Sequence, residues 1–156
     1  MLCTNILMAT ALAFGCFDIL HYGHLQYLKR AKALAGSDAK LIVVLATDAT
    51  IRAVKKRDPV FDEQARLEMI KSLKLVDDAL LGSQNPSEKY EVIRKLLPDV
   101  VVLGYDQPEA EEKLKAWLAS SNIQTKVVRV THAENAEVYK TSKAMEKLKE
   151  QITKSI

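Results

Sequence analysis

At 156 residues the chain has the length of one domain, and its 48% hydrophobic residues are enough to build one complete core. Charged residues make up 28% of the chain, a composition that excludes a membrane protein and a disordered chain. The 23 Lys and Arg residues are balanced by 20 Asp and Glu residues and interleaved with them, which argues against a nucleic-acid-binding protein.

The first apolar run covers residues 6–13 and ends shortly before Gly15. No positive charge of the kind that opens a signal peptide precedes it, and it is far too short to span a bilayer. We therefore interpret it as a buried strand and expect no membrane partner. The two cysteines, Cys3 and Cys16, form neither a disulfide framework nor a C-x-x-C pair, so we expect a cytoplasmic protein.

Further along the chain, amphipathic segments alternate with short apolar runs. Helices are expected at residues 24–35, after Asp48, from Asp62 to Leu73, from Ser87 to Leu97, from Pro108, and from Thr141 or Ser142. Further strands are expected at residues 41–46, 79–81, 100–103 and 126–130.

This alternation predicts an α/β fold in a single domain of residues 1–156. Strands separated by helices pair in parallel through right-handed crossovers, which gives a doubly wound, Rossmann-like sheet of five strands with helices on both faces. Such sheets bind ligands beyond the carboxyl ends of their strands, where the strand order reverses. Functional residues are therefore expected in the loops that follow the strands.

The most informative segment is GCFDILHYGH at residues 15–24, which joins the first strand to the first helix. Such a junction exposes backbone N–H groups and the positive end of a helix dipole, and both attract phosphate. His21 and His24 are spaced so that they can point the same way, with Gly23 between them leaving space for a ligand. Imidazoles at this position can donate hydrogen bonds to phosphate oxygens as charge builds in a transition state.

This H-x-G-H pattern, preceded by G-x-F-D, resembles the signature of the small cytidylyltransferase-like nucleotidyltransferases. Residues 57–69 resemble the second segment of that family, and the Leu-Gly-Tyr-Asp-Gln run at residues 103–107 resembles its archaeal FAD synthases most closely. Two positions depart from the pattern. Cys16 stands where the family often has Thr, and Lys140 replaces the first hydroxyl of an I-S-T-T-like segment at the start of the last helix.

The resemblance implies direct nucleotidyl transfer, in which a phosphate oxygen of an acceptor attacks the α-phosphorus of a nucleoside triphosphate and pyrophosphate leaves. The favoured reaction transfers AMP from ATP to FMN and gives FAD. One alternative is a cytidylyltransferase acting on glycerol 3-phosphate or another small phosphate. An alternative from a different class is a non-catalytic nucleotide-binding protein. The resemblance also implies Mg²⁺ or another divalent metal with the nucleotide, and a homodimer.

The same resemblance assigns roles to individual residues. His21 and His24 are expected to grip the triphosphate, and Lys55 and Lys56 to hold the acceptor phosphate or the α-phosphate. Asp18 is expected to contact the acceptor or to hold magnesium through water. The full set of expected substrate-binding residues is Cys16, Phe17, Asp18, Gly23, Arg66, Gly104, Tyr105, Asp106, Thr141 and Ser142.

Simpler interpretations of these residues stay open. The histidine pair can be packing residues, residues 55–57 a solvated charge run, and Thr141 with Ser142 ordinary helix caps. Asp106 can serve only to order the turn that it lies in. A zinc site is not expected, because Cys16 and the two histidines lack a fourth ligand at the usual spacing.

Overall fold

The computed structural model describes residues 8–36, 38–105, 108–130 and 139–154. Its five strands are β1 (Thr10–Gly15), β2 (Lys40–Leu45), β3 (Asp78–Leu81), β4 (Val100–Leu103) and β5 (Lys126–Arg129). They form one sheet in the order β3-β2-β1-β4-β5, and every neighbouring pair is parallel. The predicted doubly wound five-stranded sheet is confirmed.

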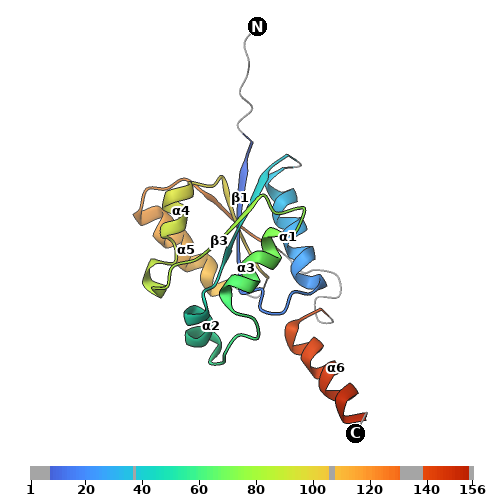
Figure 1. Ribbon diagram of the computed structural model, residues 1–156. Coiled ribbons are helices and arrows are strands. Elements are labelled where there is room, and N and C mark those ends of the chain that lie inside the picture. Colours follow the sequence, from blue (N-terminus) through green and yellow to red (C-terminus); the bar gives the residue numbers. More distant parts are fainter. Residues whose placement is uncertain (1–7, 37, 106–107, 131–138, 155–156) are drawn as a thin grey trace.

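The helices are α1 (Tyr22–Ala35), α2 (Asp48–Lys55), α3 (Glu63–Lys71), the 3₁₀ turn η1 (Pro86–Glu88), α4 (Glu91–Leu96), α5 (Pro108–Ser120) and α6 (Thr141–Lys154). Figure 1 shows α1 and α3 on one side of the sheet and α4 and α5 on the other. Two apolar clusters match this arrangement, because alternate strand residues face opposite sides. Ala11 packs with Leu28 of α1, whereas Leu12 packs with Ile93 of α4 and Leu114 of α5.

Two boundaries near the start of the chain differ from the prediction. The first strand begins at Thr10 and runs on through Gly15, because its register with β2 extends to that residue. The first helix begins at Tyr22, with His21 as its N-cap, which is two residues earlier than predicted. The H-x-G-H segment therefore forms the first turn of α1.

Two helix starts also differ from the starts predicted at Asp48 and Ser87. In each case a nearby side chain forms the capping hydrogen bond instead. The hydroxyl of Thr47, not Asp48, caps α2 by accepting a hydrogen bond from the N–H of Thr50. The side chain of Asn85, not Ser87, caps a 3₁₀ turn that precedes the short helix α4. Each capping side chain is a close chemical equivalent of its neighbour, so composition alone does not distinguish them.

The strand order reverses between β1 and β4, which is where a doubly wound sheet binds ligands. Helix α1 is tied to this point by one side chain. The hydroxyl of Tyr27 lies 2.7 Å from the carbonyl oxygen of Val102 in β4 and 3.3 Å from that of Phe14 in β1. The first turn of α1 is thereby placed at the carboxyl edge of the sheet, beside the reversal point.

Helices α2 and α6 lie at this same edge, below the sheet in Figure 1, and α6 projects away from the body. None of the described helices combines the length and the apolar character that crossing a membrane requires.

Candidate active site

The loop between β1 and α1 is shaped by the ring of Phe17. This residue has a positive φ of 50° and a side chain that is 1% exposed. A Cβ atom at Gly15 would lie 2.6 Å from the ring, so only glycine fits there. The same ring meets His24 edge-on, with 5.0 Å between ring centres. Gly15 and Phe17 of the G-x-F pattern thus allow the Phe17 ring to pack against His24.

His21 and His24 are stacked on each other, with ring centres 3.8 Å apart and ring planes 19° apart. The Nδ1 atom of each ring is buried and finds no hydrogen-bond partner among the described residues. Burial lowers the pKa of both imidazoles. It lowers that of His24 to about 3, with the charges of His21 and Lys55 acting in the same direction. A hydrogen bond of His24 with the backbone of Ile19 acts against this shift without cancelling it, so the pair is neutral at pH 7. The two Nδ1 atoms keep hydrogen-bonding capacity that a ligand can use.

Gly23 allows the start of α6 to approach the start of α1. A Cβ atom at Gly23 would lie 2.5 Å from the carbonyl oxygen of Tyr139, just before α6. The rings of Tyr22 and Tyr139 also meet edge-on at 5.0 Å. The glycine was predicted to leave space for a ligand; in the structure the space above it is taken by backbone. Its role is to bring the two helix starts together.

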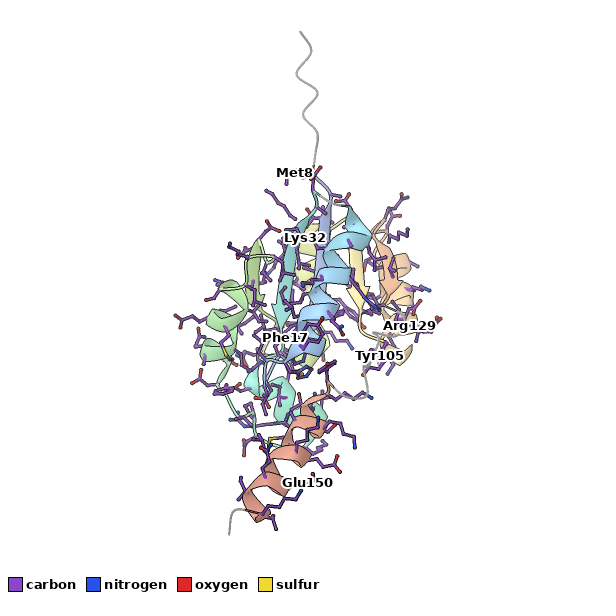
Figure 2. The ribbon with its side chains drawn as sticks, turned by 90° about the vertical axis from the view of Figure 1, so that its right-hand side faces the viewer. Met8, Phe17, Lys32, Tyr105, Arg129 and Glu150 are labelled. Atoms are coloured by element: carbon purple, nitrogen blue, oxygen red, sulfur yellow. The ribbon has the colours of Figure 1, made fainter. Side chains whose placement is uncertain are left out.

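The β4–α5 loop joins this assembly through Tyr105. The ammonium of Lys140 lies 5.4 Å from the centre of the Tyr105 ring, a cation–π contact. Figure 2 shows Phe17 and Tyr105 at the end of the sheet nearer α6, opposite Met8. Segments that are more than a hundred residues apart in the sequence therefore meet at one end of the sheet.

The N-termini of α1 and α6 are both open to an anion. Neither helix has an acidic residue in its first turn, and no side chain caps α1. Thr141 and Ser142 form the first turn of α6, the former partly buried and the latter exposed. Their hydroxyls and the backbone N–H groups at the starts of both helices point to a site for a negatively charged group.

Arg66 was predicted to contact the substrate, but its side chain is fully buried. Its Nη1 donates to the carbonyl oxygens of Cys16 at 2.6 Å and Ala46 at 2.8 Å. Its Nε donates to the carbonyl of Phe61 at 3.0 Å, and its Nη2 to the carboxylate of Asp48 at 2.7 Å. In this structure the arginine has no surface to offer a ligand. It joins the loops after β1 and β2 to the start of α3.

Asp18 also differs from its predicted position. It is 3% exposed, and its carboxylate faces the connection between α2 and α3. Oδ1 accepts hydrogen bonds from the N–H groups of Val60 at 2.7 Å and Phe61 at 3.2 Å, and Oδ2 accepts one from Arg57 at 2.6 Å. Burial alone would raise the pKa of Asp18, but these bonds outweigh it and hold the pKa below its usual range. The carboxylate is therefore committed to anchoring this connection.

Lys55 and Lys56 stand at the end of α2, where the chain turns. Lys55 is the last helical residue, and Lys56 has a left-handed backbone with φ 55°. Both side chains are exposed. Helix α2 lies at the same edge of the sheet as the first turn of α1 (Figure 1), and the charge of Lys55 lowers the pKa of His24. The structure thus brings the lysines to the same side of the molecule as the histidines.

Of the remaining predicted residues, Cys16 and Gly104 directly follow strands β1 and β4 at the same edge of the sheet. Cys16 is partly exposed, and its carbonyl is held by Arg66. Gly104 directly follows β4, and Asp106 lies outside the described residues. Arg57 was not among the predicted site residues. The signal that could have identified it is its position at the start of residues 57–69, which resemble the second segment of the family.

The described side chains do not form a metal centre of their own. Within the described residues, no three His, Cys, Asp or Glu side chains gather as a metal site requires. Asp18 already accepts three hydrogen bonds. In proteins, Mg²⁺ is commonly bound together with phosphate groups.

Comparison with known proteins agrees with this arrangement. The family model described as cytidylyltransferase-like matches residues 12–147, from β1 into α6. An FAD synthase of Methanothermus fervidus is 42% identical over 139 residues, which are 89% of this chain and 94% of that protein. An FAD synthase of Methanobrevibacter ruminantium is 43% identical over 138 residues, covering 88% of this chain and 90% of that protein.

Solved structures share the fold. A lipopolysaccharide core biosynthesis protein from Thermoplasma volcanium superposes with a TM-score of 0.73 at 39% identity, over 81% of this chain and 99% of that one. A pantoate-beta-alanine ligase from Francisella tularensis superposes with a TM-score of 0.62 over 89% of this chain and 65% of that one. At 14% identity the second likeness concerns the fold alone.

We predict that Arg66→Met destabilises the protein by about 3–5 kcal/mol, because it leaves the partly buried carboxylate of Asp48 and three carbonyl oxygens without their donor. Urea unfolding followed by circular dichroism measures this. The matched control is Arg52→Met, since Arg52 is exposed and forms its ion pair with Asp58, which is also exposed. That control should change stability little. Equal effects of the two substitutions would contradict the linking role of Arg66.

We also predict a pH dependence that comes from His24. The pKa of His24 is about 3 when folded and near 6.5 when unfolded, so the unfolded chain binds the proton more readily. The stability this contributes is fully present above pH 6.5 and is lost as the pH falls toward 3. His24→Leu should therefore lose less stability than the wild type between pH 7 and pH 5 in urea unfolding. If the wild type and His24→Leu lose the same stability between pH 7 and pH 5, His24 is not the source of the pH dependence.

Proposed function

Because the chain belongs to the cytidylyltransferase-like family of nucleotidyltransferases, we propose that it is an FAD synthase, which transfers AMP from ATP to FMN and releases pyrophosphate. The observation that carries this proposal is the neutral, stacked histidine pair, whose buried Nδ1 atoms lack partners at the reversal point of the sheet. About 40% identity to proteins named FAD synthase, over nearly the full length of both chains, supports the choice of substrates.

In this reaction the triphosphate lies against the first turns of α1 and α6. His21 and His24 contribute ring N–H groups, and the open N-termini of the two helices contribute backbone N–H groups. Thr141 and Ser142 add hydroxyl groups on the β- and γ-phosphate side. These donors are held in place before the substrate arrives, so they stabilise the charge that develops as pyrophosphate leaves.

The acceptor approaches from the side of α2. A phosphate oxygen of FMN attacks the α-phosphorus of ATP, the P–O bond to pyrophosphate breaks, and no side chain is modified. Lys55 and Lys56 reduce the repulsion between two anionic substrates that must come within bonding distance. Tyr105, next to the reversal point, lies where the planar ring of a substrate rests in this fold. A divalent cation bound to the triphosphate adds further charge neutralisation.

The test pairs FMN and ATP in one tube with glycerol 3-phosphate and CTP in another, each with Mg²⁺ and each followed by chromatography. We expect FAD and pyrophosphate in the first tube only. CDP-glycerol in the second tube alone would keep the histidine chemistry but overturn the substrates. A chain that binds nucleotides without product in either tube would favour a non-catalytic nucleotide-binding protein.

In the same assay, His21→Ala should reduce the rate of pyrophosphate release by ~10²–10³-fold, the usual effect of losing one donor to a developing charge. ATP binding, measured by calorimetry, should change far less, because the helix N-termini and Thr141 still hold the phosphates. Pyrophosphate release at the wild-type rate would show that His21 has no part in the chemistry.

We further propose that the protein is a cytoplasmic homodimer. Two-fold dimers are the most frequent soluble assemblies, and α6 supports this one, since Met145, Leu148 and Ile152 are 38%, 51% and 60% exposed at helical spacing. Light scattering after size exclusion should give twice the 17.4 kDa mass of one chain. Leu148→Glu should give the mass of one chain; a monomeric wild type would overturn the proposal.

A further inference from the structure

Arg57 is held by only one of its nitrogen atoms. Its Nη1 donates to Oδ2 of Asp18 at 2.6 Å and to the carbonyl oxygen of Asp58 at 2.9 Å. Its Nε and Nη2 make no hydrogen bond within the part of the chain that the structure describes, and the side chain is 40% exposed. The guanidinium is therefore fixed at one end and open to solvent at the other.

The group that fixes Arg57 is itself fixed by the loop that carries the histidines. Asp18 lies between Phe17, whose ring supports His24, and His21 three residues later. Its other oxygen is occupied by the N–H groups of Val60 and Phe61, so the carboxylate has no freedom to turn. The position of the open side of Arg57 is thus determined by the same short loop that positions the candidate catalytic rings.

The chemistry of this open side suits a phosphate group. A guanidinium presents parallel N–H donors that match two oxygens of one phosphate, and it stays charged at any working pH. Lys55 and Lys56 directly precede Arg57 at the exposed turn, and their charges favour an anion in the same place. The two other arginines of this region are unsuited, because Arg66 is fully buried and Arg52 is paired with Asp58 through its Nε.

Two phosphate-bearing substrates take part in the proposed reaction, and the geometry distinguishes their places. The first turns of α1 and α6 meet each other through Gly23 and Tyr139 and supply the donors for the triphosphate. Arg57 lies on the connection between α2 and α3, which contacts the loop after β1 at Asp18. We propose that Arg57 binds the phosphate of the acceptor, FMN, and that Asp18 is the residue that positions it. This inference rests on the proposed function.

The test compares Arg57→Gln with Arg52→Gln, a matched control that removes one positive charge from the neighbouring helix α2. At saturating ATP, Arg57→Gln should raise the KM for FMN by roughly 10- to 100-fold, the effect of losing a charge-assisted hydrogen bond, and should leave the KM for ATP within about threefold. Arg52→Gln should leave both KM values near the wild type. Riboflavin lacks the phosphate, so its inhibition constant against FMN should not change in Arg57→Gln.

A second measurement tests the part assigned to Asp18. Asp18→Asn removes the charge that holds Nη1, so it should also raise the KM for FMN, and Arg57→Gln added to it should raise the KM little further. Multiplying effects would mean that the two residues act separately and would overturn the positioning role. Circular dichroism shows whether each variant is folded. If Asp18→Asn is unfolded, the comparison of Arg57→Gln with Arg52→Gln tests the proposal by itself.

The outcomes separate the two proposals. If the wild type makes FAD but Arg57→Gln and Arg52→Gln have equal KM values for FMN, the assignment of Arg57 is wrong and the proposed function stands. An equal rise in the KM for ATP and the KM for FMN would also overturn the assignment, because it would place Arg57 on both substrates. If the wild type makes no FAD, the proposed function is wrong and the assignment to FMN falls with it.

Discussion

The buried guanidinium of Arg66 is the interaction on which the candidate site depends. An unpaired charge in a protein interior is strongly unfavourable, so the chain must supply acceptors from every side. Arg66 receives them from the loop after β1, the loop after β2 and the start of α3. These three segments carry the histidine pair, helix α2 and the anchor of the α2–α3 connection. Their relative positions are set by the need to satisfy one charged group.

Much of this architecture could be predicted from local patterns. Buried parallel strands are continuous apolar runs, and each helix has an apolar face, so the five-stranded sheet followed from periodicity and chain order. The spacing of His21 and His24 indicated a ligand at the first strand–helix junction, and the rings indeed stack there. Such features are encoded within about ten residues of each other, which is why a single sequence displays them.

The roles of Asp18 and Arg66 could not be predicted in the same way. Each was expected at the substrate because the resemblance to the nucleotidyltransferase family implied it. Their partners lie far along the chain: Val60 is 42 residues from Asp18, and Cys16 is 50 residues from Arg66. Such pairings are set by tertiary packing, and the periodicity of apolar residues in the sequence does not predict them. Their burial, at 3% and 0% exposed, is what separates anchoring residues from binding residues here.

Helix α6 contributes to the candidate site without contributing to the core of the sheet. None of its described residues is buried, so the core of the sheet is closed without it, yet Tyr139, just before its first turn, approaches Gly23 in the candidate site. Substitutions on the exposed surface of α6 can therefore alter the candidate site while they leave the core of the sheet intact.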